Sequence, residues 1–254
     1  MIEERDFEVR VDGLTIRGAW CARSGATRLP VLLIMHGIPR AKPEPGDQTY
    51  RVLARAAAAD GWLAVIFNFR GTGASEGDLS LAGWLRDCQA VIAWARALPA
   101  ADPARLALLG FSAGASVAIR AAAQDPAITA VAAVSSPSEY SFLTDVMPAA
   151  GWVRLFREIG LIRDPAFPTS PAEWEAEFEA AAPRKYVTAL APRPLLIMHG
   201  DEDETIPVAQ ARALYQAAGP GRELVIIPGG KHRLRADERA VRTAREWLAR
   251  MLTK

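Results

Sequence analysis

Six short and nearly continuous apolar runs recur along the chain, and they limit the folds that it can adopt. A run of this kind is typical of a strand buried on both faces, as in a parallel sheet covered by helices. Repeated strand–helix units therefore predict a mostly parallel sheet with helices on both faces. The runs occupy residues 31–35, 63–67, 106–109, 128–134, 195–198 and 224–227. Segments with helical periodicity lie between them, at residues 50–59, 83–98, 113–124, 208–218 and 237–252.

The N-terminal part of the chain follows a different pattern. Residues 7–11 and 14–21 alternate apolar and polar side chains around the pair Asp12-Gly13, which predicts an antiparallel β-hairpin. Added to the six buried strands, this hairpin gives a predicted α/β fold with a sheet of about eight strands. Ligands of such sheets bind at the carboxyl ends of the parallel strands, so functional residues are expected there.

Residues 137–186 interrupt the alternation of strands and helices, with no apolar run and six prolines. Ser170-Pro171-Ala172-Glu173 forms a capping box with proline at the first helical position, which predicts the start of a short helix. Long insertions in compact domains are usually lids or binding loops. We therefore expect a helical cap at 137–186, inserted after the sixth strand, and a core formed by residues 1–136 and 187–254. The alternative is that these apolar faces simply cover the sheet. The candidate substrate contacts in the cap are Phe142, Trp152 and Phe156.

Charge and cysteine content exclude several classes of partner. The 254 residues carry a net charge of +1 with both signs interspersed, so we expect neither nucleic acid nor a membrane as partner. Cys21 and Cys88 lack metal-site spacing, and we expect two packed, reduced thiols with no metal and no cofactor. The N-terminal residues do not form the pattern of a signal peptide, which favours a cytoplasmic location. A homo-oligomer is compatible with this composition.

Gly110-Phe111-Ser112-Ala113-Gly114 joins the apolar run 106–109 to an alanine-rich helical segment. A side chain at Gly110 or Gly114 would collide with the neighbouring strand or helix, so these glycines permit a tight strand-to-helix turn. The turn would hold the Ser112 hydroxyl above the end of the sheet, beside the free N–H groups of a helix N-terminus. Ser112 is therefore a candidate nucleophile.

A serine hydroxyl needs a base, and the chain has only three histidines. His36 and His199 each end a predicted strand and precede a glycine, which favours a structural role. His232 lies in a glycine-containing loop after the last strand and is the expected base. The acid that orients it is expected in the run at 201–204, which is otherwise typical of a solvated turn. We favour Asp203, with Asp201 as the alternative.

With the elbow Gly-Phe-Ser-Ala-Gly followed by an acid and then a histidine, the chain resembles the α/β-hydrolases across nearly its full length. Its segments 67–77, 200–207 and 229–232 are similar to those of small bacterial serine esterases and carboxylesterases. The resemblance implies the α/β-hydrolase fold and a catalytic triad. It also implies an oxyanion hole formed by two backbone N–H groups after His36-Gly37 and in the elbow. The implied triad is Ser112, Asp203 and His232, and the implied oxyanion donors are Ile38 and Ala113.

The resemblance implies a serine hydrolase that cleaves small carboxylic esters through an acyl-enzyme, with a small-molecule ester as its partner. Two alternatives stay open: a serine peptidase similar to acylaminoacyl peptidases, and a ligand-binding α/β-hydrolase without turnover. The sequence His-Gly-Ile-Pro at 36–39 departs from the three-glycine loop of many lipases, which disfavours bulky tertiary or lipid substrates. Arginines in the cap leave an acyl-CoA thioesterase open; these are Arg154, Arg157 and Arg163.

Overall fold

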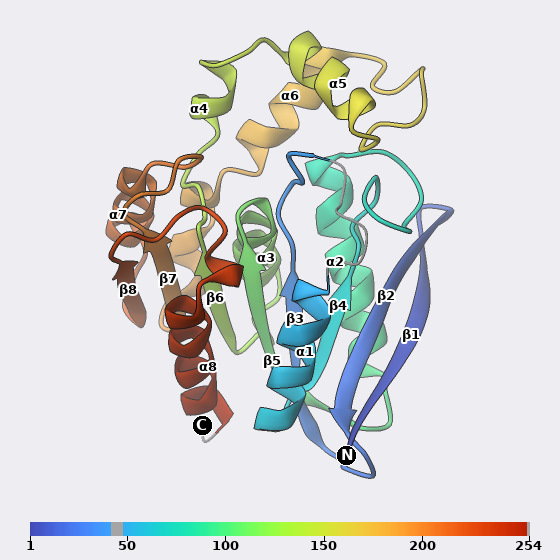
Figure 1. Ribbon diagram of the computed structural model, residues 1–254, viewed down its shortest axis with the longest axis vertical. Helices are drawn as coiled ribbons and strands as arrows, with labels where there is room; N and C mark the ends of the chain where they lie inside the picture. The colour runs from blue at the N-terminus through green and yellow to red at the C-terminus, as the bar shows by residue number, and fades with distance from the viewer. Residues whose placement is uncertain (42–47, 253–254) are drawn as a thin grey trace.

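The computed structural model describes residues 1–41 and 48–252, which build a single eight-stranded sheet covered by helices (Figure 1). The strand order is β1-β2-β4-β3-β5-β6-β7-β8, antiparallel across β1, β2 and β4 and parallel from β4 to β8. The predicted hairpin and parallel strands are confirmed. The strands are β1 (Ile2–Val11), β2 (Leu14–Arg23), β3 (Leu29–Met35), β4 (Leu63–Phe67), β5 (Ala101–Phe111), β6 (Ala130–Val134), β7 (Leu195–Gly200) and β8 (Arg222–Ile227).

The strands are uniformly apolar because both faces of the sheet are covered. Successive residues of a strand point to opposite faces, so Leu33 packs among the helices of one side and Leu32 among those of the other. The first side carries α2 (Leu81–Arg96), α3 (Ala113–Gln124) and α7 (Val208–Ala217), and the second carries α1 (Thr49–Asp60) and α8 (Glu238–Leu252). This double burial explains the continuous apolar runs of the sequence.

Several strands are longer than the sequence pattern predicts, most clearly those of the hairpin and β5. The hairpin pairing extends from Val11↔Leu14 out to Ile2↔Arg23, because charged residues on its exposed face continue the ladder. β5 begins at Ala101, where it pairs with Leu29 of β3. The register between the two strands shifts at Pro30/Val31, and the apolar part of β5 starts after this shift. Both extensions are polar, so an apolar pattern does not mark them.

The segment between β6 and β7 lies above the carboxyl ends of the parallel strands, at the top of Figure 1. It holds α4 (Ser141–Thr144), α5 (Ala149–Glu158) and α6 (Pro171–Ala180), followed by short 3-10 turns at Pro183–Lys185 and Val187–Leu190. The predicted helix start is confirmed, since Ser170 Oγ accepts the Glu173 N–H at 3.2 Å. We call the α4–α6 segment the cap.

The cap is hydrogen-bonded to the segment that follows β4. The Leu79 N–H donates to the Leu161 carbonyl at 2.9 Å, and Trp174 Nε1 donates to the Leu79 carbonyl at 2.8 Å. Arg163 Nη1 donates to the Ser75 carbonyl at 2.7 Å. Ser80 Oγ donates to Glu177 Oε2 at 2.7 Å. The cap and this segment therefore form one packed unit.

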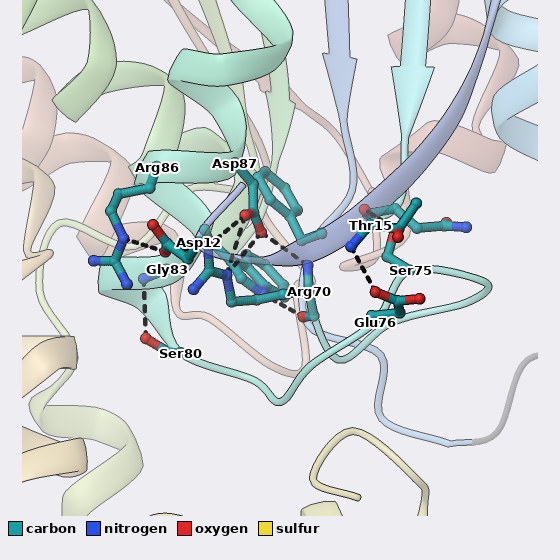
Figure 2. A network of polar contacts seen from close by, with 12 residues as sticks. Asp12, Thr15, Arg70, Ser75, Glu76, Ser80, Gly83, Arg86 and Asp87 are labelled. Atoms are coloured by element: carbon teal, nitrogen blue, oxygen red, sulfur yellow. Dashed lines mark hydrogen bonds and ion pairs between the residues drawn. The ribbon is translucent and has the colours of Figure 1, made fainter. Parts of the chain in front are cut away.

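A buried ion pair anchors the same segment to the hairpin and to α2 (Figure 2). The Arg70 backbone N–H donates to Asp87 Oδ2 at 2.9 Å, and its Nη2 donates to Asp87 Oδ1 at 2.7 Å. The same Nη2 donates to Asp12 Oδ2 in the hairpin turn at 2.8 Å. Burial raises the pKa of Asp87, although the Arg70 guanidinium acts in the opposite direction. The pair joins three elements that are distant in sequence.

Cys21 and Cys88 are both free and buried, as expected. Burial raises the pKa of the Cys21 thiol to about 11 and also raises the pKa of the Cys88 thiol. Within residues 1–41 and 48–252, no helix has the length and apolar character needed to cross a bilayer.

Asp87→Ala should lower the free energy of unfolding by about 3–5 kcal/mol, because the buried Arg70 guanidinium and backbone N–H would lose their Asp87 acceptor and only Asp12 would remain. Urea denaturation at neutral pH measures this loss. Arg86→Ala is the matched control, since half-exposed Arg86 donates to the same Asp12 carboxylate at 2.6 Å. The control should lose less than about 1 kcal/mol. Equal losses in both variants would contradict the structural role assigned to the buried pair.

Candidate active site

The turn between β5 and α3 places Ser112 in a strained backbone conformation, with φ 54° and ψ −125°. The predicted need for glycines on both sides is confirmed. A Cβ at Gly110 would lie 2.5 Å from the Ala115 Cα, and one at Gly114 would lie 2.8 Å from the Met35 carbonyl oxygen. Positive φ is costly for a residue with a side chain. This strained turn holds Ser112 at the N-terminus of α3.

The end of β3 lies directly against Ser112. A Cβ on Gly37 would be 2.6 Å from the Ser112 Cβ and 3.2 Å from its Oγ, so only glycine fits here. Ala113 is the first residue of α3, and its N–H has no acceptor within the helix. Ile38 is the next residue in the chain after Gly37. The assignment of the Ile38 and Ala113 N–H groups as oxyanion donors stays a prediction, which the close approach of Gly37 to Ser112 supports.

His36 has a structural role in holding this loop. Its Nε2 accepts the Phe69 N–H at 3.2 Å, so Nδ1 carries the hydrogen and donates to the Gly37 carbonyl at 2.8 Å. The ring packs edge-on against Phe69 and Trp84. Burial lowers the pKa of His36 to about 4. A neutral imidazole therefore ties the end of β3 to the segment after β4.

Asp203 and His232 meet through a short, fully formed contact. His232 Nδ1 lies 2.9 Å from Asp203 Oδ2 and 3.1 Å from Oδ1. The Asp203 side chain is fully buried, and its Oδ1 also accepts the N–H groups of Thr205 and Ile206 at 2.9 and 2.8 Å. Burial by itself would raise the pKa of Asp203, but hydrogen bonds from His199 and His232 outweigh it and hold that pKa well below its usual range. Asp203 therefore stays ionised beside the His232 imidazole.

Asp201, the alternative acid, does not contact the His232 ring. It is exposed, and its Oδ1 accepts the Gly229 N–H at 2.6 Å. Glu202 forms an ion pair with Lys231 at 2.6 Å, and Glu204 Oε2 accepts the His232 N–H at 3.1 Å. The acids around Asp203 are exposed, as in a solvated turn, yet each also binds the histidine turn. Sequence reasoning missed these contacts, because only the β7–β8 pairing brings the two turns together.

Ser112 and the His232 backbone are both hydrogen-bonded to the carboxyl end of β6. The Ser112 N–H donates to the Val134 carbonyl at 2.9 Å, and the next residue, Ser135, donates its hydroxyl to the His232 carbonyl at 3.1 Å. Among the described residues, no hydrogen bond joins the Ser112 hydroxyl to the His232 ring. Catalytic hydrogen bonds are often long in the absence of substrate. The contact between hydroxyl and imidazole stays a prediction.

The three candidate substrate contacts lie in the aromatic interior of the cap. Phe156 is buried, with its ring centroid 5.7 Å from that of Trp152 and 5.9 Å from that of Trp174. Phe142 stacks on Tyr140, with centroids 6.2 Å apart. A cavity of about 20 Å³ beside Trp152 and Phe156 has room for one water molecule and no ligand. Their role in substrate binding stays a prediction.

Two of the three cap arginines are engaged by backbone carbonyls. Arg157 Nη2 donates to the carbonyls of Pro165 and Phe167, both at 2.9 Å. Arg163 donates to those of Ser75 and Gly73 at 2.7 and 3.1 Å. These guanidinium groups hold the cap together, which disfavours the acyl-CoA alternative. In the part of the chain that the structure describes, no group of His, Cys, Asp or Glu side chains could hold a metal ion.

The parallel sheet, the elbow serine after β5 and the acid and histidine turns after β7 and β8 define the α/β-hydrolase class, and this chain is a member of it. Est1E of Butyrivibrio proteoclasticus, solved with ferulic acid bound, has the same fold. It superposes with a TM-score of 0.74 at 21% identity, over 98% of this chain and 100% of that one.

Within this class, the model of the X-Pro dipeptidyl-peptidase (S15) family matches residues 20–170, more than half of the chain, and the chain belongs to that family. The uncharacterized protein YfhR of Escherichia coli O157:H7 is 29% identical over 170 residues, which are 66% of this chain and 52% of that protein. Esterase LipQ of Mycobacterium tuberculosis is 30% identical over 203 residues, 75% of this chain and 46% of LipQ. The chain thus spans about half the length of these two relatives.

The free energy of unfolding should fall as the pH is lowered from about 6.5 to about 4, because the unfolded chain protonates His36 before the folded protein does. The slope from this group is at most about 1.4 kcal/mol per pH unit. His36→Gln keeps an acceptor for the Phe69 N–H but cannot titrate, so its stability should depend less on pH in this window. Urea denaturation at a series of pH values measures both slopes. Parallel curves for the two proteins would contradict the assignment.

Proposed function

We propose that the protein is a serine esterase that hydrolyses small carboxylic esters, with Ser112 as nucleophile, His232 as base and Asp203 as the orienting acid. The observation that carries the proposal is the buried Asp203 carboxylate, which lies 2.9 Å from His232 Nδ1, in a sheet whose β5–α3 turn holds Ser112 in a strained conformation. The names of LipQ and of the Est1E structure, an esterase and a ferulic acid complex, support ester chemistry.

The geometry of the pair determines which nitrogen of His232 acts. Because Nδ1 faces Asp203, Nε2 is the atom that takes the proton from Ser112 as its Oγ attacks the ester carbonyl carbon. The oxyanion that forms accepts hydrogen bonds from the N–H groups of Ile38 and Ala113, each contributing about 3–4 kcal/mol. The protonated ring then gives its proton to the leaving alcohol, and water repeats the sequence on the acyl-enzyme.

Small, uncharged esters fit this site best. An alkoxide leaves with less help from a general acid than an amine does, and the protein carries almost no net charge. The cap lies above the strand ends (Figure 1) and is built largely from aromatic and aliphatic side chains, an environment that suits acyl groups of aromatic or short aliphatic acids. The Gly37 backbone approaches the nucleophile closely, which favours acyl groups without branching at that point.

Ser112→Ala should reduce turnover of p-nitrophenyl acetate and butyrate to less than about a thousandth of the wild-type rate while the protein stays folded. Without Oγ no acyl-enzyme can form. Ser116→Ala, one turn further along α3, is the matched control, because its hydroxyl binds Tyr140 in the interior. The control should keep its activity. A turnover rate of the Ser112→Ala variant within tenfold of the wild-type rate would rule out Ser112 as the nucleophile.

A peptidase is the second candidate function, and the X-Pro dipeptidyl-peptidase family match favours it. A substrate panel separates the two: p-nitrophenyl esters of increasing acyl length, methyl ferulate, and a dipeptide Xaa-Pro p-nitroanilide. We expect kcat/KM for the best ester to exceed that for the anilide by at least about a hundredfold, because the amine is the poorer leaving group. The reverse order would establish the peptidase. Labelling by a fluorophosphonate without multiple turnover would establish the ligand-binding alternative.

A further inference from the structure

Asp203 is shared by two histidines, and the mechanism described above uses only one of them. His199 is the penultimate residue of β7, and its Nε2 lies 3.1 Å from Asp203 Oδ2. The same oxygen lies 2.9 Å from His232 Nδ1. The side chains of His199 and Asp203 are both fully buried. Two imidazoles therefore converge on one carboxylate oxygen inside the protein.

The hydrogen on His199 can be placed from its neighbours. Its Nε2 also lies 2.9 Å from the Ile206 carbonyl oxygen, which can only accept a hydrogen bond. Nε2 must therefore carry the hydrogen and share it between Ile206 and Asp203. Among the described residues, His199 Nδ1 is buried and has no hydrogen-bond partner. The only polar edge that the ring uses is the one that faces Asp203.

Two backbone N–H groups and two imidazole rings surround the Asp203 carboxylate. Oδ1 accepts the N–H groups of Thr205 and Ile206, and Oδ2 lies 3.1 Å from Nε2 of His199 and 2.9 Å from Nδ1 of His232. His199 belongs to a central strand paired on both sides, whereas His232 belongs to a turn. The rigid donor therefore fixes the oxygen that the catalytic ring needs.

We propose that His199 is a positioning residue: its Nε2–H aligns Asp203 Oδ2 toward His232 and takes up part of the negative charge on that oxygen. This inference rests on the proposed serine-hydrolase function. Loss of the His199 donor would leave more charge on Oδ2 facing the His232 ring, which favours the protonated ring. It would also let the carboxylate turn, which weakens the alignment that catalysis requires.

Charged groups reach this pair from the two turns and from Arg40, whose Nη1 donates to the Thr205 hydroxyl at 2.7 Å. The acid turn contributes Asp203 and Glu204, and the Glu204 carboxylate accepts the His232 N–H. The histidine turn contributes His232 itself, while Asp201 and Glu202 are directed to Gly229 and Lys231 at the exposed edge. The residue after β6, Ser135, contributes a neutral hydroxyl. Changes at His199 are therefore transmitted to His232 through Asp203.

His199→Phe removes the donor, keeps an aromatic ring of similar size and leaves no unpaired nitrogen. His199→Gln returns an N–H near the position of Nε2. Met198→Leu is the matched control, because Met198 is equally buried in β7 but points to the opposite face of the sheet. Each variant is purified as the full chain and checked for a native thermal transition.

With p-nitrophenyl acetate, His199→Phe should lower kcat about ten- to a hundredfold, the factor associated with one charge-assisted hydrogen bond. KM should stay within about twofold. The acid limb of the kcat/KM profile should move to higher pH by about half a unit or more. His199→Gln should recover most of the rate, and Met198→Leu should match the wild type. Unchanged kcat, or a loss that leaves the acid limb in place and that Gln does not restore, would overturn the proposal.

A second readout does not depend on turnover. In protein labelled with ¹⁵N-histidine, the pH midpoint of the His232 ring is followed by NMR, with His232→Gln used to assign its signals. The midpoint should be higher in His199→Phe than in the wild type. An unmoved midpoint overturns the positioning role even in an active esterase. A moved midpoint in a protein without ester turnover keeps that role and rejects the proposed substrate class.

Discussion

The site depends on a close approach of two backbone segments at the carboxyl ends of β3 and β5. Gly37 lies where any Cβ would strike Ser112, and Gly114 lies against the carbonyls of Met35 and His36. Strain of the kind seen at Ser112 costs about 1–3 kcal/mol and persists only where the surroundings fix it. The Ser112 N–H bond to Val134 and the packing of α3 on the sheet supply that fixation. The position of the Ser112 hydroxyl is thus a product of backbone packing.

A second contact of the same kind holds the other half of the site. β7 and β8 pair up to Gly200↔Ile227, and the two turns that follow them meet directly, since a Cβ on Gly200 would strike the Gly230 carbonyl oxygen. This approach brings the four-acid run against the histidine turn. Asp203 can then be buried as a carboxylate, because two imidazoles and two backbone N–H groups satisfy it. Each half of the site is built on glycines where backbones touch.

Much of the fold could be predicted from the sequence, for a physical reason. Central strands covered on both faces cannot tolerate polar residues, so β3 and β4 stand out as apolar runs. The polar ends of β1 and β5 were missed, because pairing with a neighbour and not burial holds them in the sheet. Helix ends were predicted well where a local signal exists, as at Ser170.

For the site, local motifs predicted the elbow glycines and favoured Asp203 over Asp201, and the Asp203 contact with His232 agrees with that choice. The contact of the second imidazole, that of His199, with Asp203 was missed, because the sequence around a histidine at a strand end does not indicate which side chain it contacts. The bond from Glu204 to the His232 backbone was missed for the same reason. Both contacts arise from sheet pairing between residues far apart in sequence, which no local pattern contains.

The hydrogen bonds between the cap and the segment after β4 limit how often the cap can lift away from the strand ends. Seven hydrogen bonds join the two: Leu79–Leu161, Trp174–Leu79, Ser80–Glu177, Arg163 to the carbonyls of Ser75 and Gly73, and the N–H groups of Arg163 and Asp164 to Asp78. At about 1 kcal/mol for each, a form with the whole cap lifted would hold fewer than roughly one molecule in a thousand. The cap therefore keeps its position above the strand ends, and in the proposed esterase a substrate would have to fit beneath a cap of fixed shape.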